Sequence, residues 1–190
     1  MAKPSGRPIR DELLASATTL IQRVGVNGCS YGALADELGI SSPTIHHHFR
    51  TKDDLVGAVA ARYREDFAAR VDAIGSGDAV EDIVAFADLF DATAERDAMC
   101  LCGSVASDWS TVGESARTEV SGFFADQVVW LSGRLTDGAE AGSIELGSES
   151  DATARMLLAL LQGAMLLARA GDDDSSPSAM VRRFLAISGN

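Results

Sequence analysis

The chain has 190 residues, of which 46% are hydrophobic and 6% aromatic, with 18 Gly, 4 Pro and 3 Cys. This length and composition exclude a disordered tail, a collagen and a disulfide-rich scaffold, and they predict one or two domains with a substantial core. The formal net charge of −12, taken over the whole chain, argues against nucleic-acid binding, because like charges repel the phosphate backbone.

Three features indicate a cytoplasmic protein without membrane association. The longest apolar run, Met156 to Ala168, contains Gln162 and is shorter than a membrane-spanning helix requires. The amino-terminal residues lack the apolar core of a signal peptide. Three cysteines without an obvious pairing fit a reducing compartment.

The charge is distributed unevenly along the chain. Residues 1–52 contain six Lys or Arg and four Asp or Glu, a net of +2, whereas residues 53–190 contain ten and 24, a net of −14. Such asymmetry is typical of a chain whose two parts meet different partners. A chance fluctuation gives the same numbers, so the charge alone does not decide between these interpretations.

Helical periodicity predicts an all-α chain. Apolar residues recur at steps of three and four from Ile9 to Val24, and Gly25 is expected to end this first helix. Ser30 is the predicted N-cap of a short second helix that ends at Gly39.

The third and later helices carry similar signals. Ser41 and Ser42 cap the third helix, with Pro43 in its first turn, and Thr51 caps a fourth helix, with Asp54 three residues on. The fourth helix covers residues 52–74, and further helices are expected at 79–95, 97–108, 114–136, 150–170 and 177–187. Only residues 143–146 alternate like a strand, and they are too short and isolated to build a sheet.

The segment from Ser30 to Phe49 has the layout of a helix-turn-helix, whose second helix enters the major groove of DNA. Ile45 and Phe49 stand four residues apart and are expected to anchor the inner face of that helix. An ordinary pair of short helices in a bundle gives a similar pattern.

Polar groups are expected on the remaining faces of the same helix. Thr44, His47 and His48 carry hydroxyl and imidazole groups that reach phosphates or base edges. Lys52 begins the next helix, where its ammonium and nearby backbone N–H groups can hold a phosphate. His46, His47 and His48 do not predict a metal site, because neighbouring helical residues point about 100° apart. We expect no metal and no cofactor.

The order of these residues resembles the DNA-binding domain of TetR-family transcriptional regulators. The resemblance extends from Ile9 to Val59 and is densest over residues 39–55, which read GISSPTIHHHFRTKDDL. The remaining two thirds resemble the family only in their helical layout. The resemblance implies a three-helix DNA-binding domain over residues 1–55, a connecting helix at 52–74, and an effector-binding and dimerisation domain over residues 76–190.

Carried over position by position, the resemblance implies roles for two groups of residues. Those expected to face DNA are Ser30, Ser42, Thr44, His46, His47, His48 and Lys52, and those expected in the core are Ala35, Leu38, Ile45 and Phe49. His46 stands where the family often has Tyr, so a weaker or pH-dependent phosphate contact is expected there. The basic residues Lys3, Arg7 and Arg10 are candidates for further DNA contacts.

The family also implies a small-molecule pocket among the later helices. Candidate pocket residues are Phe90, Met99, Cys100, Phe123 and Trp130. Core packing is the alternative for each of them. Cys100 and Cys102 offer a second possibility, a thiol that senses oxidants or electrophiles, which requires an exposed thiolate of low pKa. Burial as small apolar side chains is the alternative for both cysteines.

Residues 152–170 are apolar almost all round, which implies a partner surface. The family pairs its last two helices with those of a second copy, so we expect a homodimer whose interface includes Leu157, Leu160, Leu161, Met165, Met180 and Phe184. Burial within one chain is the alternative.

An enzyme is not expected. All three histidines lie in one short helix, so none remains for a catalytic triad elsewhere, and the sequence contains no common nucleophile, phosphate-loop or zinc-protease motif. The sequence therefore predicts a homodimeric regulator, a repressor that a small-molecule inducer releases from a palindromic DNA operator. The alternative is a thiol-based sensor that uses Cys100 or Cys102.

Overall fold

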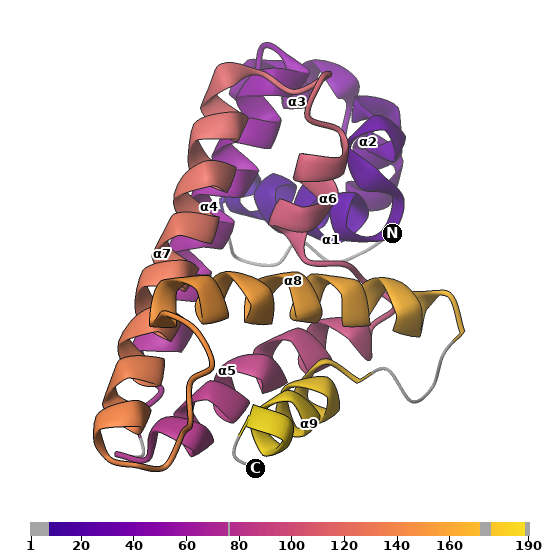
Figure 1. The fold of residues 1–190 in the computed structure, drawn as a ribbon. Helices are drawn as coiled ribbons and strands as arrows, with labels where there is room; N and C mark the ends of the chain where they lie inside the picture. The colour runs from indigo at the N-terminus through magenta and orange to yellow at the C-terminus, as the bar shows by residue number, and fades with distance from the viewer. Residues whose placement is uncertain (1–7, 76, 172–175, 189–190) are drawn as a thin grey trace. The chain divides into compact units, whose positions relative to one another are not determined.

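The computed structural model describes residues 8–75, 77–171 and 176–188. Within these ranges all regular structure is helical (Figure 1). The helices are α1 (Ile9–Gly28), α2 (Tyr31–Leu38), α3 (Ser42–His48), α4 (Lys52–Asp72), α5 (Ala79–Ala94), α6 (Leu101–Ser107), α7 (Glu114–Glu140), α8 (Ser150–Arg169) and α9 (Pro177–Ser188). The all-α prediction is confirmed, and residues 143–146 lie outside any strand.

Most predicted helix ends are confirmed to within a few residues. Two differ more: α6 begins at Leu101 rather than near residue 97, and α7 extends to Glu140 rather than 136. Gly25 does not end α1 but interrupts it, with φ 75° and ψ 173°, and one more helical turn follows. A left-handed φ favours glycine, because a Cβ crowds the backbone there.

The chain divides into two compact units. The first contains the described residues up to Phe67 together with Leu101–Gly122, and the second contains Ala68–Cys100 with the residues from Phe123 onward. This division differs from the boundary expected near residue 76, because α6 packs against α1. Whether residues 1–55 act as the functional DNA-binding domain stays a prediction.

The core of the first unit is mainly aliphatic and gathers side chains from α1 to α4. Leu13, Leu34, Ile45 and Leu55 are completely buried, and Phe49 is 3% exposed. Of the four predicted core residues, Ala35, Ile45 and Phe49 are buried, whereas Leu38 is half-buried at the end of α2.

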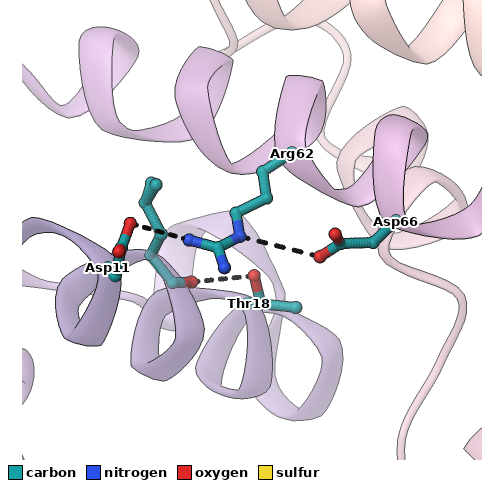
Figure 2. Close-up of polar contacts among 5 residues, drawn as sticks. Asp11, Thr18, Arg62 and Asp66 are labelled. Atoms are coloured by element: carbon teal, nitrogen blue, oxygen red, sulfur yellow. Dashed lines mark hydrogen bonds and ion pairs between the residues drawn. The ribbon is translucent and has the colours of Figure 1, made fainter. Parts of the chain in front are cut away.

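An arginine on α4 ties that helix to α1 (Figure 2). The Arg62 Nη1 atom lies 2.9 Å from the Asp11 Oδ1 atom, and its Nε atom lies 3.6 Å from Asp66 Oδ2 on the next turn of α4. These half-exposed pairs contribute modestly to stability, about 0–1 kcal/mol each. The Arg62–Asp11 pair links α4 to α1, whereas the Arg62–Asp66 pair lies within α4.

In the second unit, α9 packs against α5 and α8, and α5 also contacts α8. The Phe86 ring stacks on Trp130 with centroids 5.2 Å apart and lies 5.5 Å from the Phe90 ring. Phe86 and Phe123 are completely buried. Aromatic packing therefore fills the centre of this unit.

The length of α8 corrects the expectation that its apolar run is too short to span a membrane. By length and composition it is apolar enough to cross a membrane. The central helix of a soluble protein meets the same criterion. Seven of its residues are buried, so its apolar character has a structural role in the fold.

We predict that Ile45→Ala lowers the free energy of unfolding by about 2–5 kcal/mol, because Ile45 is fully buried and its truncation leaves a cavity. The matched control Val129→Ala removes an apolar side chain that is 74% exposed, and should change stability by no more than about 0.5 kcal/mol. Denaturant unfolding measures both. Equal destabilisation of the two variants would contradict the assignment of Ile45 to the core.

Candidate nucleic-acid interface

Helices α2 and α3 are joined by a tight turn of three residues. Gly39 adopts the left-handed conformation, with φ 65° and ψ 32°, and ends α2. The Ala35 carbonyl accepts from the Gly39 N–H and, over 3.0 Å, from the Ile40 N–H, which completes the C-terminal cap of α2. This geometry allows a short second helix to leave the body of the unit.

Helix α3 begins at a serine cap and buries one side. The Ser41 Oγ atom accepts from the Thr44 N–H over 3.4 Å and lies 2.8 Å from the Thr44 hydroxyl. Ile45 is completely buried, whereas His46 and His47 are exposed. The helix therefore presents polar side chains on the sides away from its buried residue.

The structure places the predicted DNA-facing residues on three neighbouring segments. Ser30, His46 and His47 are exposed, and Ser42, Thr44, His48 and Lys52 are half-buried. The Ser30 hydroxyl accepts from the Ala33 N–H over 3.1 Å, so Ser30 caps α2, as predicted. Contacts of all seven residues with DNA stay a prediction.

Lys52 stands in the first turn of α4, and this turn is built by a reciprocal capping box. The Thr51 hydroxyl accepts from the Asp54 N–H over 3.1 Å, and the Asp54 carboxylate accepts from the Thr51 N–H over 3.0 Å. This pair satisfies two backbone donors at the start of the helix. The predicted cap at Thr51 is confirmed.

Tyr31 fixes the end of α3, a role that the sequence did not reveal. Its hydroxyl lies 2.9 Å from the Phe49 carbonyl and 2.6 Å from the Thr51 carbonyl. Its ring meets the His46 ring edge-on, with centroids 4.7 Å apart. Burial is the main cause that raises the pKa of Tyr31, followed by the charge of Asp54, so its hydroxyl keeps the proton that it donates. These hydrogen bonds have no local sequence signal, because they join residues 18 and 20 positions apart.

Arg10 of α1 lies beside Phe49, the residue that directly follows α3. Its guanidinium carbon is 5.4 Å from the centre of the Phe49 ring, within the range of a cation–π contact. Lys3 and Arg7, the other two basic residues expected to reach DNA, lie outside the described residues.

Asp108 holds the connection between α1 and α2. The break at Gly25 removes the N–H groups of Val26 and Asn27 from the helical ladder. The Asp108 Oδ2 atom accepts from Val26 N over 2.9 Å and from Asn27 N over 3.4 Å, and its Oδ1 atom accepts from the Asn27 side chain over 2.7 Å. A residue just beyond α6 thus supplies the acceptors that the broken helix lacks, and Asp108 was missed because it is 82 residues away from Val26.

The aromatic residues of the predicted effector pocket are buried or half-buried in the second unit, and their contact with an effector stays a prediction. Phe90 is 2% exposed and Phe123 completely buried, and both belong to the packed core. Trp130 is half-buried and stacks on Phe86. Cys100 is 1% exposed, and Met99 is half-buried beside it. Cavities in the second unit have other linings, which include residues 144–148 of the loop between α7 and α8.

The thiol-sensor alternative is not favoured by the burial of the cysteines. Cys100 and Cys102 are at most 1% exposed, whereas a sensor requires an accessible thiolate. Burial also raises the pKa of the third thiol, Cys29, above its ordinary value. All three behave as small apolar core residues. The described residues hold no group of three or more His, Cys, Asp or Glu that could bind a metal.

The expected dimer-interface residues divide into two sets. Leu157, Leu161 and Met165 are at most 1% exposed within one chain, and their assignment to an interface between chains stays a prediction. Leu160, Met180 and Phe184 are half-buried. The exposed apolar residues of α8 are instead Met156, Leu166 and Leu167, which are 47%, 59% and 47% exposed. A helix that is apolar on every side does not indicate from its sequence which side faces inward.

We predict that Asp108→Ala lowers the free energy of unfolding by about 1–3 kcal/mol, because it leaves the Val26 and Asn27 amides without their acceptor. Asp108→Asn keeps one acceptor oxygen and should be less destabilising. The exposed Asp72→Ala is the charge-matched control and should be close to neutral. Thermal unfolding measures the series, and equal stability of Asp108→Ala and Asp72→Ala would contradict the role of Asp108.

Comparison with known proteins agrees with this geometry. The family model described as bacterial regulatory proteins of the tetR family matches residues 13–59. The HTH-type transcriptional repressor DhaR of Mycobacterium sp. strain GP1 is 24% identical over 161 residues, which cover 84% of this chain and 81% of DhaR.

Solved structures match nearly the whole chain. The crystal structure of a TetR-family transcriptional regulator from Agrobacterium tumefaciens has a TM-score of 0.89 and 31% identity, covering 94% of this chain and 96% of that one. A TetR transcriptional regulator from Legionella pneumophila has a TM-score of 0.84 and 30% identity, covering 98% of both chains. The chain therefore belongs to the TetR family and is a DNA-binding transcriptional regulator rather than an enzyme.

Proposed function

We propose that the protein is a cytoplasmic homodimeric repressor that binds a palindromic operator through α3 and releases it when a small molecule binds. The observation that carries this proposal is the α2–turn–α3 arrangement, in which Ile45 is fully buried and His46 and His47 are exposed on the same short helix. That arrangement suits entry into a major groove about 12 Å wide. Gel-shift measurement on DNA from upstream of the protein's own gene tests it, and absence of any specific complex would contradict it.

The proposed contacts fall into two classes. His47 and Thr44 lie on α3 and would read base edges, whereas Ser30, Ser42, His46 and His48 would add contacts at the rim of the groove. Lys52 stands at the N-terminus of α4, where backbone N–H groups and the helix dipole favour a phosphate. Phosphate contacts position the protein, and base contacts give the sequence specificity.

The distribution of charge is consistent with these contacts. The −14 of residues 53–190 belongs mainly to a part of the chain that does not need to approach DNA. Each DNA-binding domain has few cations, so its affinity for DNA depends on the placement of α3 and on dimerisation. Two copies whose α3 helices lie about 34–36 Å apart would fit successive major grooves on one side of a duplex.

The second copy is proposed to cover the outward face of α8. Met156, Leu166 and Leu167 expose apolar surface on one helix, and the half-buried Met180 and Phe184 of α9 add to it. Exposed apolar surface concentrated on neighbouring elements marks an interaction site. A symmetric pair buries the same patch on both copies, which is the usual interface of a dimer.

The proposal of repression rests on the relative DhaR, whose name describes it as a transcriptional repressor. Release by an effector requires that DNA and effector favour different arrangements of the dimer, so that each lowers the affinity for the other.

We predict that Lys52→Ala weakens binding to every DNA sequence and makes the plot of log affinity against log salt concentration shallower by about 0.9 for each phosphate that Lys52 neutralises. Arg96→Ala is the matched control, because Arg96 is an exposed cation in the second unit. Fluorescence anisotropy across a salt titration measures both. An unchanged slope for Lys52→Ala would rule out its phosphate contact.

We also predict that Leu166→Glu converts the dimer to a folded monomer, because the side chain is 59% exposed in one chain and places a charge in the proposed interface. Operator affinity should fall about a hundredfold, because a monomer has only one DNA-binding domain. Val129→Glu is the control, since Val129 is 74% exposed on α7. Sedimentation velocity measures the mass, and a Leu166→Glu dimer would contradict this interface.

A further inference from the structure

A cavity of about 330 Å³ lies where the loop between α7 and α8 meets α9. Its apolar lining consists of Leu135, Ile144, Leu146, Met156, Phe184 and Leu185. This volume and the predominance of apolar groups are typical of small-molecule sites. None of these residues belongs to the aromatic cluster that the sequence suggested.

A second cavity of about 350 Å³ borders the first. Val80 and Val84 of α5 contribute to its lining, and Ile144 and Leu185 line both cavities. Two side chains therefore form the shared wall. Movement of Ile144 would join the two volumes into a single site.

Ile144 is held in this wall by its own loop. The Gly138 carbonyl accepts from the N–H groups of Ser143 and Ile144, over 2.9 and 3.1 Å, and from the Ser143 hydroxyl over 3.2 Å. A Cβ at Gly138 would lie 2.6 Å from the Ile144 Cδ1 atom. A larger residue at Gly138 would require the Ile144 side chain to shift, so Gly138 allows Ile144 to pack closely against α7.

The polar groups of the first cavity define the chemistry that it accepts. The Ser148 and Thr153 hydroxyls lie 3.0 Å apart, and Thr153 is 4% exposed. Two hydroxyls that share one hydrogen bond retain a second proton and spare acceptor positions for a ligand. Glu145 and, in the second cavity, Arg182 are exposed, so the charged groups lie towards solvent.

We propose that this cavity is the effector site and that it accepts a neutral, largely apolar small molecule, aromatic or alicyclic, with one hydrogen-bonding group for the Ser148–Thr153 pair. The proposal rests on the effector response proposed above. It differs from the sequence-based pocket, because Phe90 and Phe123 fill the core rather than line a space.

The location gives a route to regulation. Met156 lies on α8 and Phe184 on α9, and both line the cavity. The same two helices carry the surface proposed to pair two copies. A ligand in the cavity would therefore alter how the two copies pair, and this pairing sets the distance between the two DNA-binding domains.

The neutral fluorophore N-phenyl-1-naphthylamine tests the site, because its emission rises in an apolar environment. The full-length wild-type protein should bind it saturably at one site per chain. Leu146→Trp fills the cavity and should weaken binding at least tenfold, whereas Val129→Trp adds the same bulk at an exposed position of α7 and should leave binding unchanged. Circular dichroism verifies that both variants are folded.

A second variant is expected to tighten dye binding, which a folding defect does not do, so it distinguishes a filled cavity from a misfolded Leu146→Trp. Ile144→Ala opens the wall between the two cavities and should tighten binding of the larger neutral dye Nile red relative to the wild type. Equal affinity of wild type and Leu146→Trp for the fluorophore, or no binding to the wild type, would overturn the proposal. Binding to the Leu166→Glu monomer but not to the wild-type dimer would also overturn it, because a second copy would then occupy the cavity.

The same preparations are assayed for binding to operator DNA. If the protein binds operator but Leu146→Trp leaves its affinity for the fluorophore unchanged, the cavity proposal is refuted and the proposed function is not. Failure of the wild-type protein to bind operator would instead refute the proposed function.

Discussion

The first unit is organised around the placement of α3. The helix has seven residues, well below the length at which an isolated helix is stable in water. Ile45 buries its inner side, Ser41 caps its first turn, and the Tyr31 hydroxyl binds carbonyls at its end. Contacts with the surrounding unit, rather than helix propensity, thus hold the backbone of α3 in place.

The neighbouring segments are fixed by polar contacts that reach across the unit. Asp108 supplies acceptors to the turn that follows the break in α1, and Arg62 joins α1 to α4 (Figure 2). Asp108 binds backbone amides that would otherwise lack a partner, so removing it costs more than removing a half-exposed ion pair. The arrangement of α1, α2 and α4 around α3 follows from these contacts together with the aliphatic core.

In the second unit, α8 has two apolar sides with different roles. Leu157 and Leu161 pack inside the unit, while Leu166 and Leu167 remain exposed. Burial against α5 and α9 therefore uses only part of the apolar surface of the helix. The unused surface lies on the helix that also lines the cavity through Met156, which is why ligand binding and subunit pairing are linked in the proposed mechanism.

Local signals in the sequence were sufficient to predict most helices and the caps of α2, α3 and α4, because each such signal acts over a few residues, although Gly25 interrupts α1 rather than ending it. Ser30, Ser41 and Thr51 cap the helices that they were predicted to cap, and the ordered run from Gly39 to Leu55 identified the family. The inward side of α8, the role of Asp108 and the position of the cavity emerged only from the packing of the folded chain. The difference lies in the range of the interactions: a helix that is apolar all round has no phase of its own, and a hydrogen bond across 82 residues leaves no local pattern. A cavity, in turn, forms where distant side chains fail to fill space.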